Sequence, residues 1–145
     1  MDDLVYKRVT SVSDPDIPYL LKMYNHPNIS CFISVSDNYF NYVTHTEKVY
    51  FYKVYQYDKL IGAIHLEMFA ETLYMDILIF PKFQRNGLGT KIVKDLQADA
   101  LKLNYHKIQV SIDEKNKASI KTFERSGFIF IHREGELLNY IYKMQ

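Results

Sequence analysis

A strand, a glycine-containing turn, a helix and a second strand follow one another in the middle of this chain. Residues 73–80 are mostly apolar and typical of a strand, which Pro81 closes. Apolar residues at helical spacing then predict a helix over residues 87–104, and Lys107–Asp113 has the pattern of a further strand. A connection of this kind crosses over with a right hand and leaves its two strands parallel. The chain therefore needs a sheet with a parallel pair, covered by helices.

The residues before this unit predict a strand, two helices and an antiparallel meander. Asp14 is the expected N-cap of the first helix, with Pro15 at its first helical position. Pro27 ends that helix, because the residue before a proline avoids the helical region. The expected elements are a strand over 4–9, helices from Asp14 and over 38–43, and strands over 49–57, 60–69 and 73–80.

The residues after the unit predict a helix and a terminal hairpin. Residues 117–125 suit a helix that Ser126 and Gly127 stop. Strands over 128–132 and 137–143 then turn over residues 134–136. No repeat, linker or change of composition divides the sequence. We therefore expect a single domain over residues 1–145 with an α+β fold.

Composition excludes several classes of protein. Hydrophobic residues make up 48% and charged residues 24% of the 145 residues, which is typical of a globular protein with its own core. The net charge of +1 provides no overall field that attracts nucleic acid or an anionic membrane. The single cysteine, Cys31, excludes an internal disulfide and fits a reducing compartment. Because the acidic start also lacks the features of a signal peptide, we expect a cytoplasmic protein without nucleic-acid or membrane partners.

The junction between residues 81 and 90 carries the clearest chemistry. Gly87 and Gly89 let the backbone come close to a ligand, and the helix that starts there offers unpaired amide groups and the positive end of its dipole. These features suit a phosphate, to which Arg85 and Lys91 can add charge. The spacing fits neither a Walker loop nor a dinucleotide fingerprint, which needs a third glycine where Ile92 stands. On spacing alone, glycines that serve only the turn geometry remain an alternative.

Two blocks of sequence resemble one known family. The string Gln84-x-x-Gly87-x-Gly89, after a strand that ends at Pro81, is similar to the acetyl-CoA pyrophosphate loop of the GNAT superfamily of N-acyltransferases. Residues 116–128, an asparagine followed by a helix that ends in Gly-Phe, resemble the later motif of that superfamily. The segment 25–33 is also similar to the branch that contains ribosomal-protein N-terminal acetyltransferases.

The resemblance implies a fold and a set of cofactor contacts. It implies a mostly antiparallel central sheet of six or seven strands with a splayed parallel pair and helices on both faces. Main-chain groups on one strand would pair with the pantetheine arm of acetyl-CoA, and the loop amides would hold the pyrophosphate. Asn116 would hydrogen-bond the arm, cap its helix, or do both, since the cap position lies where the arm passes. The expected cofactor-binding residues are Ile77, Leu78, Ile79, Gln84, Arg85, Asn86, Gly87, Leu88, Gly89, Thr90 and Asn116.

The implied reaction is direct transfer of an acetyl group from acetyl-CoA to an amine, without a metal. Much of the superfamily uses a tyrosine to protonate the departing thiolate, but Phe123 stands at that position here. In the ribosomal-protein branch a serine has that neighbourhood, and the matching residue is Ser119. We therefore predict that Ser119 supplies the proton, with a serine that only satisfies the helix end as the alternative. Ser111 lies where some relatives place an acidic base, so that base is expected to be absent.

The general base and the acceptor stay open. The candidate bases are His65, Glu67, Asp76, Glu134 and Glu136, and the sequence assigns none of them. We do not expect Cys31 to form an acyl-enzyme, because no neighbour that would activate it is identifiable. The two functions in view are an N-acetyltransferase for a small amine or a protein N-terminus, and a non-catalytic acyl-CoA sensor or scaffold. A homodimer is also possible, since exposed strands at a sheet edge can pair.

Overall fold

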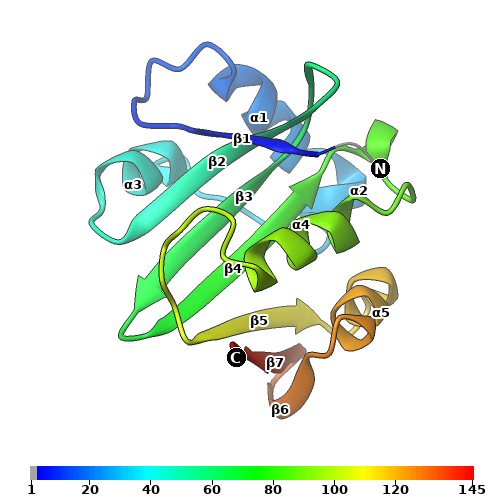
Figure 1. Ribbon diagram of the computed structural model, residues 1–145. Coiled ribbons are helices and arrows are strands. Elements are labelled where there is room, and N and C mark those ends of the chain that lie inside the picture. The colour runs from blue at the N-terminus through cyan, green and yellow to red at the C-terminus, as the bar shows by residue number, and fades with distance from the viewer. Residues whose placement is uncertain (1–2) are drawn as a thin grey trace. The chain divides into compact units, whose positions relative to one another are not determined.

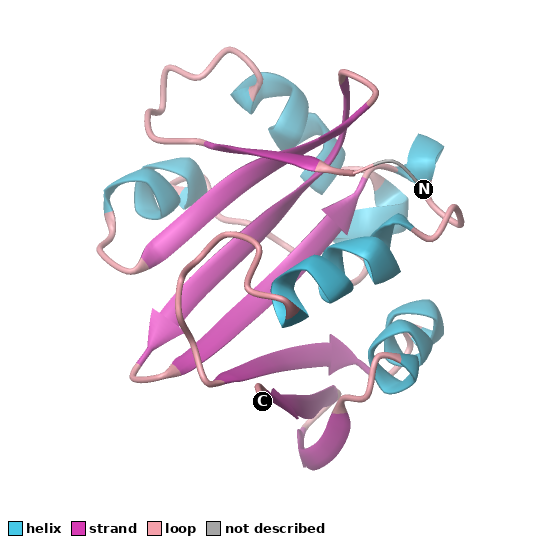
Figure 2. Ribbon diagram, viewed as in Figure 1, coloured by secondary structure: helices cyan, strands magenta, loops and turns pink. Residues whose placement is uncertain are grey.

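The computed structural model describes residues 3–145, which form a seven-stranded sheet with helices (Figures 1 and 2). The strand order is β1-β2-β3-β4-β5-β7-β6. Strands β4 and β5 pair in parallel through Thr72, Leu73 and Tyr74 of β4, whereas β1–β2, β5–β7 and β6–β7 are antiparallel. The α+β fold with its parallel pair is thus confirmed.

The chain divides into two compact units, which are described separately. The first holds the chain up to Leu66 together with Ile77–Gln84, and the second holds Glu67–Asp76 and Arg85–Gln145. Strands β3 and β4 contribute residues to both units. The expectation of a single domain over the whole chain stays a prediction.

The first unit packs three short helices against a sheet. Its core is apolar and includes Leu20, Phe40, Phe51, Ala63 and Phe80, so residues far apart in the sequence share one hydrophobic cluster. Its elements are β1 (Val5–Arg8), α1 (Ile17–Tyr24), α2 (Pro27–Ser30), α3 (Tyr39–His45), β2 (Val49–Gln56), most of β3 (Lys59–Phe69), the end of β4 (Thr72–Ile79) and the 3₁₀ turn η1 (Pro81–Phe83).

The second unit contains two helices and the C-terminal strands. Strand β5 alternates, with Ile108, Val110 and Ile112 buried and the residues between them less so, as expected for a strand that is covered on one face. Its elements are the start of β4, α4 (Leu88–Gln97), β5 (Lys107–Asp113), α5 (Lys117–Arg125), β6 (Ile129–Glu134) and β7 (Leu137–Lys143).

The helix predicted over residues 87–104 is shorter than expected and ends at Gln97. Asp99 adopts a left-handed conformation, with φ of 50°, which a continuing helix does not allow. Its carboxylate accepts hydrogen bonds from the amides of Leu103 and Asn104, both at 2.8 Å. The aspartate therefore competes with the helix for backbone donors and organises a loop instead.

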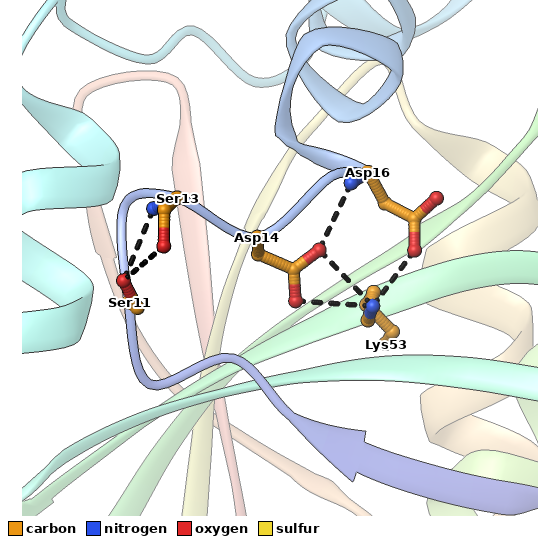
Figure 3. A network of polar contacts seen from close by, with 5 residues as sticks. All are labelled: Ser11, Ser13, Asp14, Asp16 and Lys53. Atoms are coloured by element: carbon orange, nitrogen blue, oxygen red, sulfur yellow. Dashed lines mark hydrogen bonds and ion pairs between the residues drawn. The ribbon is translucent and has the colours of Figure 1, made fainter.

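The first helix also starts later than predicted. Helix α1 begins at Ile17 with Asp16 as its N-cap, so Asp14 is not the cap and Pro18, rather than Pro15, lies in the first turn. Asp14 is used differently, because its Oδ1 accepts from the Asp16 amide at 2.9 Å and its carboxylate contacts Lys53 (Figure 3). The break at Pro27 is confirmed, although α2 follows it directly.

Lys53 on β2 ties this turn to the sheet. The lysine is only 8% exposed, and its Nζ lies 3.0 Å from Asp14 Oδ2 and 2.7 Å from Asp16 Oδ2 (Figure 3). Burial alone lowers the pKa of Lys53, but the hydrogen bonds to Asp16 and Asp14 outweigh it and hold the pKa above its ordinary value. The lysine is therefore charged at neutral pH and fixes the start of α1.

Tyr105 makes stability depend on pH in the alkaline range. Its hydroxyl donates to the Leu96 carbonyl, and burial, followed by the charge of Asp99, raises the pKa of Tyr105. Below pH 10 the phenol is protonated in both states, whereas above it only the unfolded chain loses the proton. Stability should therefore fall by about 1 kcal/mol between pH 10 and 11 from this group. Urea denaturation of wild type and Tyr105→Phe at both pH values checks this, and an equal fall in the two proteins would contradict it.

Candidate functional site

The start of α4 has the backbone geometry expected of a phosphate loop. Gly87 is the N-cap in a left-handed conformation, with φ of 76° and ψ of 8°, which glycine adopts without the steric cost that other residues incur. Arg85 is also left-handed, with φ of 67°. Two of the three residues before Leu88 therefore have positive φ, so the backbone immediately before α4 is neither helical nor extended.

The first amides of α4 are available to a ligand. The first helical hydrogen bond runs from the Lys91 amide to the Gly87 carbonyl at 3.1 Å, so the N–H groups of Leu88, Gly89 and Thr90 have no acceptor within the helix. Gly87 has no side chain to cap them. Leu88 is buried and anchors the turn, whereas a Cβ built on Gly89 would meet no atom within 4 Å. This open, positively polarised helix start can hold a pyrophosphate.

The two basic side chains near the loop, Arg85 and Lys91, differ in their surroundings. Arg85 and Asn86 are exposed. Lys91 instead forms an ion pair with Asp95, with Nζ 3.0 Å from Oδ1, one turn further along the same helix. Lys91 is therefore engaged within the helix, whereas the Arg85 side chain is exposed beside the loop.

The end of β4, in the first unit, has a fixed backbone. The Gln84 side chain donates from Nε2 to the Ile79 carbonyl at 3.0 Å, and the Phe80 amide donates to the Ile61 carbonyl at 3.0 Å. A Cβ on Gly62 would collide with the Leu78 carbonyl oxygen and lie 3.2 Å from the Ile79 Cα. Gly62 thus allows β3 to approach the stretch for which pantetheine pairing is expected. The sequence analysis missed this residue, although a glycine inside a strand is a known sign of close backbone approach.

We expect Gly62→Ala to destabilise the protein by about 2–3 kcal/mol, because the added methyl group must displace the β4 backbone. Acetyl-CoA binding should weaken at the same time, since the displaced carbonyl belongs to Leu78. Urea denaturation and calorimetric titration measure the two effects. Gly89→Ala is the matched control for stability, because its Cβ has open space. A Gly62→Ala protein as stable as that control would contradict the prediction.

Asn116 is the N-cap of α5, as one of the two sequence-based alternatives predicts. Its side-chain oxygen accepts a hydrogen bond from the Ser119 amide at 3.3 Å. Ser119 is half-buried, and among residues 3–145 its hydroxyl has no hydrogen-bond partner. Phe123 is buried and packs edge-on against Phe128, with ring centroids 5.0 Å apart. The structure thus brings Asn116 and Ser119 together and leaves the serine hydroxyl available.

The candidate bases lie in different places. His65 is in the first unit, where its Nδ1 lies 2.7 Å from the Tyr39 hydroxyl, whereas Glu67 and Asp76 belong to the second unit. Glu134 pairs with His132, while the Glu136 carbonyl accepts from the Glu114 amide. Of the other residues that the sequence analysis considered, Ser111 donates to Asn139, and Cys31 is exposed.

Over the described residues no group of three or more His, Cys, Asp or Glu side chains could hold a metal, and no helix has the length and apolar content to span a membrane.

Solved structures share this fold over nearly the whole chain. A domain from Methanocaldococcus jannaschii matches with a TM-score of 0.83 and 17% identity, over 98% of this chain and 99% of its own. The spermidine N-acetyltransferase of Vibrio cholerae, in complex with CoA and spermine, matches with 0.81 and 16%, over 97% and 95%. The Campylobacter jejuni N-acetyltransferase PseH, in complex with acetyl coenzyme A, matches with 0.78 and 12%, over 98% and 99%. At these identities the likeness concerns the fold.

Sequence comparison identifies the family directly. No curated protein matches the chain significantly. The acetyltransferase (GNAT) family, in contrast, matches residues 17–128, which include the α4 loop, Asn116 and α5. Since the match spans most of the chain and agrees with the fold, this chain belongs to the acetyltransferase (GNAT) family.

Proposed function

We propose that this protein transfers an acetyl group from acetyl-CoA directly to an amine. The observation that carries the proposal is the uncapped start of α4, where Gly87 and Gly89 leave three consecutive amides open to a pyrophosphate. Membership of an acetyltransferase family supports it. So do the similar structures that contain CoA or acetyl coenzyme A.

The cofactor contacts follow the two motifs that resemble the family. Main-chain groups of Ile77, Leu78 and Ile79 would pair with the pantetheine arm, and Asn116 would hydrogen-bond it. The loop residues Gln84, Arg85, Asn86, Gly87, Leu88, Gly89 and Thr90 would surround the pyrophosphate. This assignment is supported by the family match over both motifs and by the open geometry of the loop.

The acceptor must reach the thioester as a neutral amine. At pH 7 deprotonation costs about 4.6 kcal/mol for a lysine-type amine and about 1.4 kcal/mol for an α-amine. An enzyme without a strong base near the reacting nitrogen therefore favours α-amines. The nitrogen attacks the thioester carbon and the carbon–sulfur bond breaks. The nitrogen releases one proton to water, and the departing thiolate takes up one proton, so that an amide and CoA thiol are formed.

We propose that Ser119 donates that proton, because its hydroxyl has no partner in the described chain and Phe123 cannot donate. Ser119→Ala should lower turnover by about ten- to a hundredfold, since a CoA thiol leaves without much help. Acetyl-CoA affinity should stay unchanged. Thr122→Val is the control, because within residues 3–145 its hydroxyl bonds only to the Ala118 carbonyl of the same helix. Full turnover in Ser119→Ala would exclude the role.

The second candidate function is a non-catalytic acyl-CoA sensor. The observation that favours it is Phe123, which stands where much of the superfamily has the tyrosine that protonates the thiolate. Release of CoA thiol with a panel of alkylamines and N-terminal peptides distinguishes the two. Thiol release that depends on one acceptor class supports the transferase. Tight acetyl-CoA binding without release over the whole panel supports the sensor.

A further inference from the structure

One face of the C-terminal strands carries a row of polar side chains. On β5 the buried residues Ile108, Val110 and Ile112 share one face, and Ser111 projects from the other. Ser111 pairs with Asn139 on β7, which pairs in turn with His132 on β6. Because residues directly opposite each other project to the same side of a sheet, the three side chains form one row across three strands.

Asn139 has an unusual environment within this row. It is 3% exposed, and its Oδ1 accepts a hydrogen bond from the Ser111 hydroxyl at 2.5 Å. In the described part of the chain its Nδ2 has no hydrogen-bond partner, yet that nitrogen is not fully enclosed. A nearly buried amide group is costly unless its donors are satisfied. Asn139 therefore presents N–H donors that water or a ligand must accept.

His132 lies beside Asn139 next to a register shift in β6. Ile129 pairs with Ile141 and Phe130 with Tyr140, and the next pair is then His132 with Asn139. Ile131 is the extra residue at this irregularity. Counted from Phe130, a regular ladder would place Ile131 beside Asn139, whereas the pairs nearest the hairpin turn place His132 there. The irregularity separates these two registers, and bulges of this kind are common next to functional sites.

Glu134 determines which nitrogen of His132 can accept a proton or a hydrogen bond. Its Oε1 lies 2.7 Å from the Nε2 of His132. A carboxylate accepts but does not donate, so Nε2 carries the hydrogen in the neutral ring and Nδ1 is the acceptor. The row thus offers N–H donors on Asn139 and an acceptor on His132. Ile129 and Leu137, both exposed, add apolar surface nearby on the same hairpin.

We propose that this row binds the first peptide group of the acceptor, so that the substrate is an α-amino amide such as a peptide N-terminus. The carbonyl oxygen of that group accepts from Asn139 Nδ2, and its N–H donates to His132 Nδ1. This inference rests on the proposed acetyl transfer. The row lies near the C-terminal end of β5, from which the chain runs directly to Asn116, the expected contact of the pantetheine arm. An amine without the neighbouring amide would lack both hydrogen bonds.

Matched acceptors and matched variants test the proposal. Thiol release is measured at saturating acetyl-CoA with an alanine tripeptide amide and with an alkylamine that has no carbonyl group. His132→Phe keeps a flat ring without the acceptor, and Asn139→Asp keeps the partner of Ser111 without the N–H donors. His106→Phe is the control, because His106 forms a similar exposed pair with Glu71, 3.0 Å apart, away from the row.

We expect both variants at the row to raise the KM for the peptide about tenfold, as the loss of one hydrogen bond predicts. The kcat/KM of these two variants for the alkylamine should stay within about twofold of wild type. The kcat/KM of His106→Phe should stay within the same range for both acceptors. Equal effects on the two acceptors, or none, would overturn the inference while leaving acetyl transfer intact. So would a wild-type protein that uses the alkylamine better than the peptide after correction for amine pKa.

A binding measurement separates this inference from the proposed function. In the CoA-loaded protein, the side-chain amide resonance of Asn139 should shift when the tripeptide amide is added, whether or not turnover occurs. A shift without thiol release would support the subsite and refute the transferase. Thiol release with the peptide and an unchanged Asn139 resonance would support the transferase and refute the subsite.

Discussion

The Gly89→Val protein is expected to fold as stably as wild type and to bind acetyl-CoA more than about a hundredfold more weakly, because several amide–pyrophosphate hydrogen bonds are lost together. A Cβ at this position meets no protein atom within 4 Å, and valine is no worse than glycine in a helix. The new side chain therefore occupies space outside the protein, where the pyrophosphate is expected to lie. Thermal unfolding and calorimetric titration with acetyl-CoA measure the two properties.

Two comparisons make this result interpretable. Lys94→Val places the same side chain on an exposed position of α4 away from its start, and it should leave binding unchanged. Gly87→Val does not separate binding from folding, because φ of 76° strains a β-branched residue. Wild-type affinity in the Gly89→Val protein would exclude the phosphate loop.

Lys53→Ala should cost about 3 kcal/mol of unfolding free energy, since removal of the buried lysine leaves two partly buried carboxylates without compensation. The value lies at the lower end of the usual range because the Asp16 side chain, at 37% exposure, keeps part of its hydration. Urea denaturation at neutral pH measures the loss.

A variant without any of the three charges tests the cause. In Lys53→Met combined with Asp14→Asn and Asp16→Asn, most of the lost stability should return, because no unpaired charge stays buried. The Asp14→Asn change keeps a side-chain oxygen that can accept from the backbone amide of residue 16, as the Asp14 carboxylate does in the wild type. A loss in Lys53→Ala below about 1 kcal/mol would show that the network is no stronger than an exposed ion pair.

The elements that were predicted correctly have capping and terminating residues at their own ends in the sequence. Helix α5 has the predicted bounds, because Asn116 caps its start and Gly127, with φ of 90°, follows its end. Helix α4 continues in the sequence as apolar residues at helical spacing, yet Asp99 ends it by binding two amides of the following loop. A side chain that competes for backbone donors is not visible in a hydrophobic pattern.

In the candidate site, too, some features could be predicted from the sequence and others could not. The α4 loop could be predicted because Gly87 and Gly89 are close in sequence and act through their own backbone. A glycine inside a strand signals a close approach at Gly62, but its partner Leu78 could not be predicted, and neither could the pairing of Asn139 with Ser111, because these partners lie on other strands. Such contacts need the strand register, which turns and bulges set and periodicity alone does not.

The irregularity at Ile131 affects how this chain should be compared with its relatives. An alignment without a gap in β6 would match Ile131, rather than His132, to the residue that faces the middle of β7 in a protein with a regular strand. Counted from the hairpin turn, deletion of Ile131 would leave His132 beside Asn139, whereas deletion of His132 would bring the aliphatic Ile131 to that position. Because β6 is the last strand of the sheet, neither deletion requires another strand to move. The length of β6 can therefore diversify acceptor choice in evolution even where the cofactor motifs do not change.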